Sequence, residues 1–181
     1  MTSKLVETLE LERIEVNLFR GYTPDRWKFR IFGGQVIAQS LLAASETVEN
    51  RVCHSLHAYF IRPGDPEVPI VFQVDRSRDG GSFTTRRVIA VQHGHQIFNM
   101  SASFMAPEEG RLQHQLAMPD VPGPDELPDQ REVLRKAARN KPGVDDRLPM
   151  QLMEPVEIRH VDAGRGKPAR GETTEQIWFR A

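Results

Sequence analysis

The sequence lacks the features of a membrane-spanning or disulfide-stabilised protein. It has one cysteine, Cys53, among 181 residues, which excludes an intramolecular disulfide and favours a reducing compartment. No segment approaches the roughly 20 apolar residues that a membrane-spanning helix needs. The N-terminal segment carries acidic residues and no long apolar core, which is not typical of a signal peptide. We therefore expect a soluble, cytoplasmic protein.

The sequence also lacks an excess of either charge. Lys and Arg number 24 and Asp and Glu number 25, which gives a net charge of -1. Nucleic acids and anionic membranes attract proteins chiefly through an excess of positive charge. This composition therefore predicts no nucleic-acid partner.

Motifs for phosphate binding, metal binding and serine hydrolysis are absent as well. The pair Gly33-Gly34 fits neither a GxxxxGK[ST] phosphate loop nor a GxGxxG dinucleotide loop, and no GxSxG motif is present. His54 and His57 lie three residues apart in a predicted strand, so we expect them on opposite faces. His93 and His95 have no evident third ligand. We predict no metal and no cofactor.

What the sequence does contain is one long apolar helix pattern among strand patterns. Val36, Ile37, Leu41, Ala44 and Val48 recur at helical spacing after Gly34, and the first three turns carry few charges. Alternation predicts strands at 11–21, 54–61, 69–78, 82–92 and 95–107, of which the last two form a hairpin over 82–106. A short helix is expected at 4–10. The order predicts an α+β fold in which a curved antiparallel sheet encloses one helix.

Composition divides the chain into three regions. Residues 1–106 hold the predicted helix and sheet, and residues 107–150 hold seven prolines and one short helix pattern, REVLRKAARN. Residues 151–181 contain two strand patterns, EPVEIRHV and EQIWFRA. Two strands alone do not form a stable sheet, so they either join the first sheet or begin a second domain.

The glycine pair at the helix start has two interpretations. One is close packing of the helix against a strand. The other is that the free N–H groups of the first turn face a ligand carbonyl or an oxyanion. The first acid of the helix is Glu46, which lies about 18 Å along the axis from Gly34. That distance is too long for Glu46 to act as a general base at the helix start.

Several long motifs resemble one family. FRG, FGGQVIAQSLLAA, HSLHAYFIRPGDP, RDGGSFTTRRVIAVQHGHQIFNMSASF and MPDVPGPDELP are similar, in this order, to the acyl-CoA thioesterase II, or TesB-like, family. The resemblance runs from about residue 5 to residue 181. It implies a double hotdog fold, of which this chain resembles the N-terminal hotdog and the start of the second. It further implies hydrolysis of fatty acyl-CoA to free fatty acid and CoA without a metal, as part of lipid metabolism.

The resemblance also bears on the site residues. The family's catalytic Asp, Thr and Gln lie in the second hotdog, so we assign no catalytic residue to this chain. The first helix of the family helps to form the walls of the acyl and CoA sites. By position we predict substrate contacts from Gly33, Gly34, Gln35, His57, Arg62 and Arg86.

Because the helix start lacks a base, two hypotheses about the activity of the chain stay open. The chain is expected to be either a thioesterase half or a non-catalytic hotdog module that binds acyl-CoA or a partner chain. A third hypothesis is that it folds only as a homo-oligomer or together with a separate second hotdog half, because a sheet edge and a helix face would otherwise be exposed.

Overall fold

The computed structural model describes residues 4–24, 30–110, 112–139, 156–161 and 174–181. The chain divides into two compact units, which are essentially Val6–Leu112 and Gln113–Ala181. The elements of the first are α1 (Lys4–Leu9), β1 (Leu11–Glu15), β2 (Leu18–Gly21), α2 (Gly33–Ser45), β3 (Val52–Phe60), β4 (Ile70–Asp79), β5 (Phe83–Gln92) and β6 (His95–Met105). The other contains the 3-10 turn η1 (Pro124–Glu126), α3 (Gln130–Arg139), β7 (Glu157–His160) and β8 (Ile177–Arg180).

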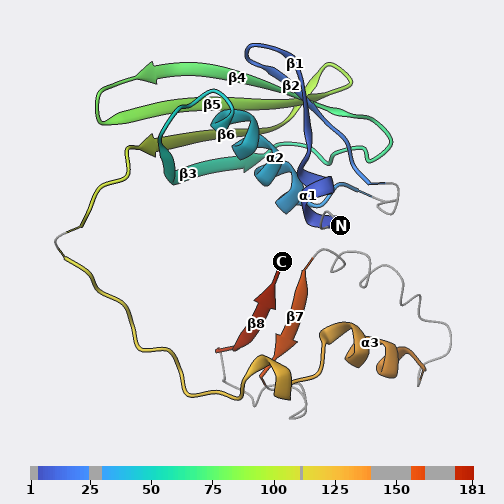
Figure 1. The fold of residues 1–181 in the computed structure, drawn as a ribbon. Helices are drawn as coiled ribbons and strands as arrows, with labels where there is room; N and C mark the ends of the chain where they lie inside the picture. The colour runs from blue at the N-terminus through green and yellow to red at the C-terminus, as the bar shows by residue number, and fades with distance from the viewer. Residues whose placement is uncertain (1–3, 25–29, 111, 140–155, 162–173) are drawn as a thin grey trace. The chain divides into compact units, whose positions relative to one another are not determined.

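The first unit is an antiparallel sheet with α2 against one face (Figure 1). Its six strands follow the order β1-β2-β4-β5-β6-β3. Burial alternates along β5 and β6, as expected for strands with one face toward the core. The core consists mainly of the inward side chains of the sheet and one side of α2: Phe19, Ile31, Val36, Ala43, Ala44, Ile70, Phe72, Val74, Val88, Ala90, Ile97, Phe98, Met100, Ala102 and Phe104.

The predicted hairpin over 82–106 is confirmed. β5 pairs with β6 from Phe83 opposite Met105 to Gln92 opposite His95. The turn between them places His93 at φ 50° and Gly94 at φ 72°. Two successive left-handed residues match the twist of a two-residue hairpin, and this conformation explains the glycine.

The prediction of one strand over 11–21 is wrong, because the chain reverses there. β1 and β2 form a tight antiparallel hairpin with a turn at Val16 and Asn17. Val16 is exposed in this turn, and the Asn17 carbonyl accepts a hydrogen bond from Val74 N–H. A two-residue turn need not interrupt alternation between apolar and polar residues, so this pattern alone does not reveal the reversal.

The long helix is confirmed and begins one residue earlier than predicted, at Gly33, but it ends at Ser45, so Val48 lies beyond it rather than in its apolar stripe. The sheet covers its apolar side, where Val36, Ala43 and Ala44 are buried. Gln39 and Ser40 are also fully buried. This burial explains why so few charges occur along the helix, since an unpaired buried charge is costly.

The second unit has its own small sheet. β7 and β8 pair antiparallel from Glu157 opposite Arg180 to His160 opposite Ile177, and they do not join the first sheet. The helix predicted from REVLRKAARN is confirmed as α3. The residues at 140–155 and 162–173, which include part of the predicted linker and the loop between the last two strands, lie outside the described residues. The predicted boundaries of the three regions, between residues 106 and 107 and between residues 150 and 151, stay predictions.

Candidate functional site

Backbone donors are available at the start of α2. Phe32 is the N-cap, with φ -68° and ψ 129°, and its side chain makes no capping hydrogen bond. Its carbonyl accepts the N–H groups of Gln35 and Val36 at 3.0 and 3.4 Å. Among the described residues, the N–H groups of Gly33 and Gly34 have no acceptor. They lie at the positive end of the helix dipole, so they are suited to bind a carbonyl oxygen or an oxyanion.

The glycine pair is explained by close packing rather than by backbone conformation. Neither Gly33 nor Gly34 has a positive φ. A Cβ atom on Gly33 would lie 2.9 Å from Cζ of Phe60, and one on Gly34 would lie 2.4 Å from Cε1 of Phe32. Carbon atoms in contact normally stay about 3.5 to 4.0 Å apart. Since Phe60 belongs to β3, Gly33 packs the helix start against a strand, as the first of the two interpretations expects, whereas the ring beside Gly34 belongs to the N-cap residue of α2.

Two phenylalanine rings therefore flank the free donors. Phe32 is 52% exposed and Phe60 is 56% exposed, although both are large and apolar. The Phe60 ring lies 5.1 Å from the ring of Phe98, which is fully buried, so the core supports it from one side. Neither ring was predicted as a site residue. Phe60 lies in a predicted strand, where phenylalanine normally indicates core, and Phe32 precedes the predicted helix without a pattern of its own. The adjacent glycines were the available signal.

The loop after β3 lies beside the same helix end. Ile31 N–H donates to the Gly64 carbonyl at 3.4 Å, and a Cβ atom on Gly64 would lie 2.8 Å from Cδ1 of Ile31. Arg62 in this loop is exposed, and its Nη1 donates to the Gln96 carbonyl at 2.7 Å. The structure thus brings the loop of Arg62 to the α2 end that carries Gly33 and Gly34.

This loop also carries an acid that the sequence analysis did not consider. The Asp65 carboxylate accepts the Glu67 N–H at 3.0 Å and lies 3.1 Å from Nε2 of His93. The hydrogen bond from Glu67 and, after it, the one from His93 hold the pKa of Asp65 below its ordinary value. A carboxylate with a lowered pKa is a weaker base. The first turn of α2 itself carries no acid.

Gln35 is turned into the protein rather than toward solvent. Its Nε2 donates to the Tyr22 carbonyl at 3.1 Å and lies 3.3 Å from the Thr23 hydroxyl. The neighbouring amide of Gln39 donates to the Thr8 carbonyl at 2.9 Å. The Gln35 Oε1 atom is buried without a hydrogen-bond partner. The two amides thus tie α2 to the segments before it and leave one buried acceptor near the helix start.

His57 lies on the other face of the sheet from α2. It pairs with exposed Ser101 on β6, whereas the neighbouring residues of β6 that face the core are buried. The expectation that His54 and His57 point to opposite faces is wrong. A β-bulge between Cys53 and Ser55 shifts the alternation, and His54 Nε2 lies 2.8 Å from the Ser103 hydroxyl on the face of His57. The structure therefore separates His57 from the glycine pair.

Arg86 lies at the opposite end of α2 from Gly33. It is 1% exposed, and its Nε and Nη2 donate to the hydroxyl and the carbonyl of Thr47 at 2.8 and 3.0 Å. Nη2 also donates to the Asp79 carboxylate at 2.6 Å. Nη1 donates to two carbonyls, those of Arg78 and Thr85. These partners account for the guanidinium donors and join the end of α2 to the β4–β5 hairpin.

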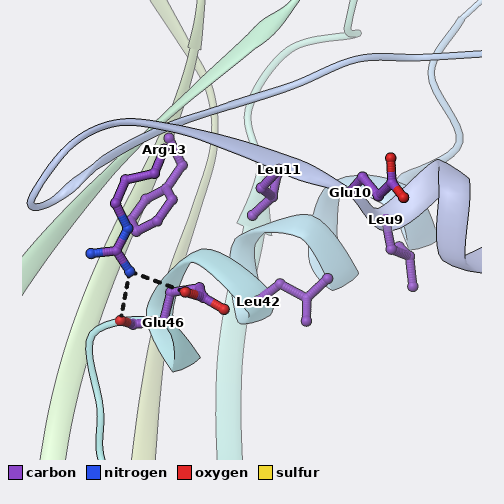
Figure 2. Close-up of a pocket in the computed structure, with 7 residues that line it drawn as sticks. Leu9, Glu10, Leu11, Arg13, Leu42 and Glu46 are labelled. Atoms are coloured by element: carbon purple, nitrogen blue, oxygen red, sulfur yellow. Dashed lines mark hydrogen bonds and ion pairs between the residues drawn. The ribbon is translucent and has the colours of Figure 1, made fainter.

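A pocket of about 270 Å³ lies along the C-terminal half of α2 (Figure 2). Its apolar wall is formed by Leu9, Leu11, Phe19 and Leu42, and its charged residues are Glu10, Arg13 and Glu46. Arg13 Nη2 donates to the carbonyl and the carboxylate of Glu46 at 3.1 and 3.0 Å. The pocket thus adjoins the end of α2 opposite the glycine pair.

Metal ligands do not gather in the part of the chain that the structure describes. No group of three or more His, Cys, Asp or Glu residues there lies close enough to hold an ion. Nor does a helix in the described ranges have the length and apolar character needed to cross a membrane.

Solved structures resemble the fold over nearly the whole chain. An acyl-CoA thioesterase II, TesB2, from Mycobacterium marinum is 43% identical with a TM-score of 0.70, and the match covers 96% of this chain and 59% of that one. A hot dog fold protein from Alicyclobacillus acidocaldarius has a TM-score of 0.71 at 18% identity, covering 99% of this chain and 63% of that one. The predicted α+β hotdog fold is confirmed.

Sequence comparisons identify the family. Human acyl-coenzyme A thioesterase 8 is 40% identical over 193 residues, which cover 100% of this chain and 59% of the relative. Acyl-CoA thioesterase 2 of Haemophilus influenzae is 41% identical, over 77% of this chain and 49% of the relative. The chain thus spans only about half to three fifths of the length of these relatives. Residues 23–105 match the acyl-CoA thioesterase N-terminal domain, and the chain belongs to the acyl-CoA thioesterase family.

Proposed function

We propose that the protein hydrolyses acyl-CoA thioesters to the free acid and CoA, and that this chain supplies the oxyanion-binding part of the site. The observation that carries the proposal is the pair of free N–H groups at Gly33 and Gly34, flanked by two exposed phenylalanine rings, in a member of the acyl-CoA thioesterase family. Fatty acyl-CoA as the substrate, a role in lipid metabolism and a cytoplasmic location belong to this proposal.

The reaction proceeds by attack of water on the thioester carbonyl. The C–O bond forms as a base takes the proton of water, and negative charge develops on the carbonyl oxygen. The N–H groups of Gly33 and Gly34 stabilise this charge. The C–S bond then breaks, and the CoA thiolate takes up the proton. Since the described start of α2 offers no acid, the base is assigned to the second hotdog half.

Two other predicted site residues, Arg62 and Gln35, belong to the end of the domain that carries the start of α2. Arg62 is exposed, and one of its Nη atoms is held by the Gln96 carbonyl, so its other donors are proposed to meet a phosphate of CoA. Gln35 is proposed to hold the helix start in place through its contacts with Tyr22 and Thr23. Substrate contacts are not extended to His57 or Arg86, because their positions lie on another face and at the other helix end.

The domain limits belong to the same proposal. Residues 1–106 are the N-terminal hotdog, 107–150 the proline-rich linker with a short helix, and 151–181 the opening strands of a second hotdog. The proposed partner is a second copy or a second hotdog half at the edge strand β3. In support, β3 is an edge strand of the sheet, and the apolar side chains of Val52, Leu56 and Tyr59 are exposed along it.

The second candidate function is binding of acyl-CoA without hydrolysis. The observation that favours it is the absence of an acid from the first turn of α2, together with the hydrogen bonds that occupy Asp65. Both functions use the same donors, and they differ only in whether a base is present.

One experiment separates the two functions. The 181-residue chain is mixed with palmitoyl-CoA, release of the thiol is followed, and binding of 2-oxoheptadecyl-CoA, an analogue that keeps a carbonyl but lacks the scissile bond, is measured by calorimetry. Turnover above the buffer rate supports hydrolysis by this chain. Binding without turnover shows that this chain alone lacks the base. Turnover that appears when a second hotdog half is added then supports hydrolysis, and its absence supports the binding module. If the analogue does not bind, both functions are wrong for this chain.

A further inference from the structure

We propose that Phe32 and Phe60 contact the acyl chain next to the thioester carbonyl and make the site select long acyl groups over acetyl. This inference rests on the proposed function, because it assumes that a thioester carbonyl lies at the start of α2. It adds two specificity-determining side chains to that site.

The two rings lie against the glycine pair at the start of α2. A Cβ atom on Gly33 or Gly34 would overlap the ring of Phe60 or Phe32, at 2.9 and 2.4 Å. Each ring therefore lies in contact with a residue whose N–H group is free. A carbonyl that accepts these hydrogen bonds places its substituents within reach of the two rings.

Both rings are largely exposed. More than half of the surface of each of these two residues is accessible, whereas Phe19, Phe72, Phe98 and Phe104 of the same unit are almost completely buried. Two large apolar side chains beside a pair of polar donors form an amphipathic surface. Its chemistry fits a ligand with a carbonyl and an alkyl chain, which is the structure of a long-chain thioester.

Both rings are held in place by the elements behind them. Phe60 packs against the buried ring of Phe98 at 5.1 Å, with an angle of 56° between the ring planes. Phe32 is the N-cap of α2, and its backbone is fixed by the N–H groups of Gln35 and Val36. Because the supports are part of the core and of the helix, the apolar surface is formed before the ligand arrives. Such preorganisation lowers the entropic cost of binding.

The charges around this surface agree with the assignment. Arg62 follows Phe60 by two residues and is exposed in the adjoining loop. The acid in that loop, Asp65, is engaged by Glu67 N–H and His93. The alkyl chain therefore meets apolar rings, while the anionic CoA portion has a cation nearby.

The test compares a short and a long carbonyl analogue on the full 181-residue chain. Acetonyl-CoA and 2-oxodecyl-CoA are titrated by calorimetry into the wild-type chain and into F60A, F60L and F83A. Phe83 is the matched control, since it is 52% exposed and lies on β5 opposite Met105, on the face of the sheet away from α2. Thermal unfolding confirms that each variant is folded.

We expect the wild-type chain to bind the long analogue at least about tenfold more tightly than acetonyl-CoA, since more apolar surface leaves water. F60A loses about tenfold in affinity for 2-oxodecyl-CoA and changes little for acetonyl-CoA. F60L, which keeps an apolar side chain, recovers most of the loss. F83A changes neither affinity.

The outcomes distinguish this inference from the proposed function. If neither analogue binds to the wild-type chain, both are overturned. If both analogues bind but with equal affinity, or if F60A and F83A have equal effects, the proposed function stands and the role of the rings is wrong. If F60A instead weakens self-association without changing the binding of either analogue, Phe60 covers a protein partner and the inference is again overturned.

Discussion

At the scale of single residues, Arg86 shows how a charge is accommodated inside this domain. Its guanidinium is almost fully buried, and its hydrogen bonds run to Thr47, Arg78, Asp79 and Thr85. A planar group with five donors can join a helix end to a hairpin in a way that the single ammonium of lysine cannot. Arg86 is thus a structural link between α2 and the β4–β5 hairpin.

We predict that R86A lowers the free energy of unfolding by about 2 to 4 kcal/mol, because several buried acceptors lose a charged donor at once. The exposed side chain of Asp79 keeps the loss below that of a fully buried ion pair. The measurement is chemical denaturation at neutral pH. The neighbour Arg87 is exposed, and R87A should change the same quantity by less than about 0.5 kcal/mol. Equal effects of the two variants would contradict the role given to Arg86.

At the scale of elements, the loop between β3 and β4 is held by a small polar cluster. Buried Gln92 donates to the carbonyls of Asp65 and Val68, and its Oε1 accepts the Asp65 N–H at 2.8 Å. The Asp65 carboxylate adds bonds with Glu67 and His93. This cluster fixes the loop that carries Arg62 beside the start of α2.

The lowered pKa of Asp65 predicts a dependence of stability on acid. Since the pKa is lower in the folded than in the unfolded chain, the stabilisation is complete above the ordinary aspartate pKa of about 4 and is lost as pH falls through the folded value. In D65N, whose amide oxygen still accepts the Glu67 N–H, the free energy of unfolding should fall less steeply between about pH 5 and pH 2. Denaturation curves at several pH values measure this. Parallel curves for the two proteins would refute the prediction.

At the scale of the whole molecule, the sheet ends in an edge strand, β3. β3 is nine residues long and, among the described strands, pairs with β6 alone, so it forms one edge of the sheet. Exposed apolar side chains along it, such as Tyr59 at 59%, carry no charge that would prevent association. Pairing between two β3 strands would remove this edge.

We predict that the chain sediments as a dimer and that Y59K raises its dissociation constant at least about tenfold, because two added charges would face each other across the edge. Y22K is the control, since Tyr22 has similar exposure but lies beyond the end of β2. Its dissociation constant should stay within about twofold of the wild-type value. A wild-type chain that sediments as a monomer at all accessible concentrations would disprove association through β3.

Much of the fold could be predicted from the sequence because its elements have strong periodic patterns. The start of the helix at Gly33, the hairpin of β5 and β6 and the helix α3 were found in this way to within a residue or two, whereas the end of α2 was predicted too late. The reversal at Val16 and Asn17 and the bulge at His54 were missed. Both lie within a pattern of alternation, which records the face of each residue but neither the direction of the chain nor an inserted residue.

The sequence by itself determined the family, the enclosed helix and the absence of an acid from the first turns of that helix, because each depends on the identity and order of neighbouring residues. Only the tertiary structure decided which predicted site residues come together. It brought the loop of Arg62 to the glycine pair, placed His57 on the other face and Arg86 at the other helix end, and put two exposed phenylalanine rings against the glycines. These residues are distant in sequence, and their proximity follows from strand register and side-chain packing, which no local pattern encodes.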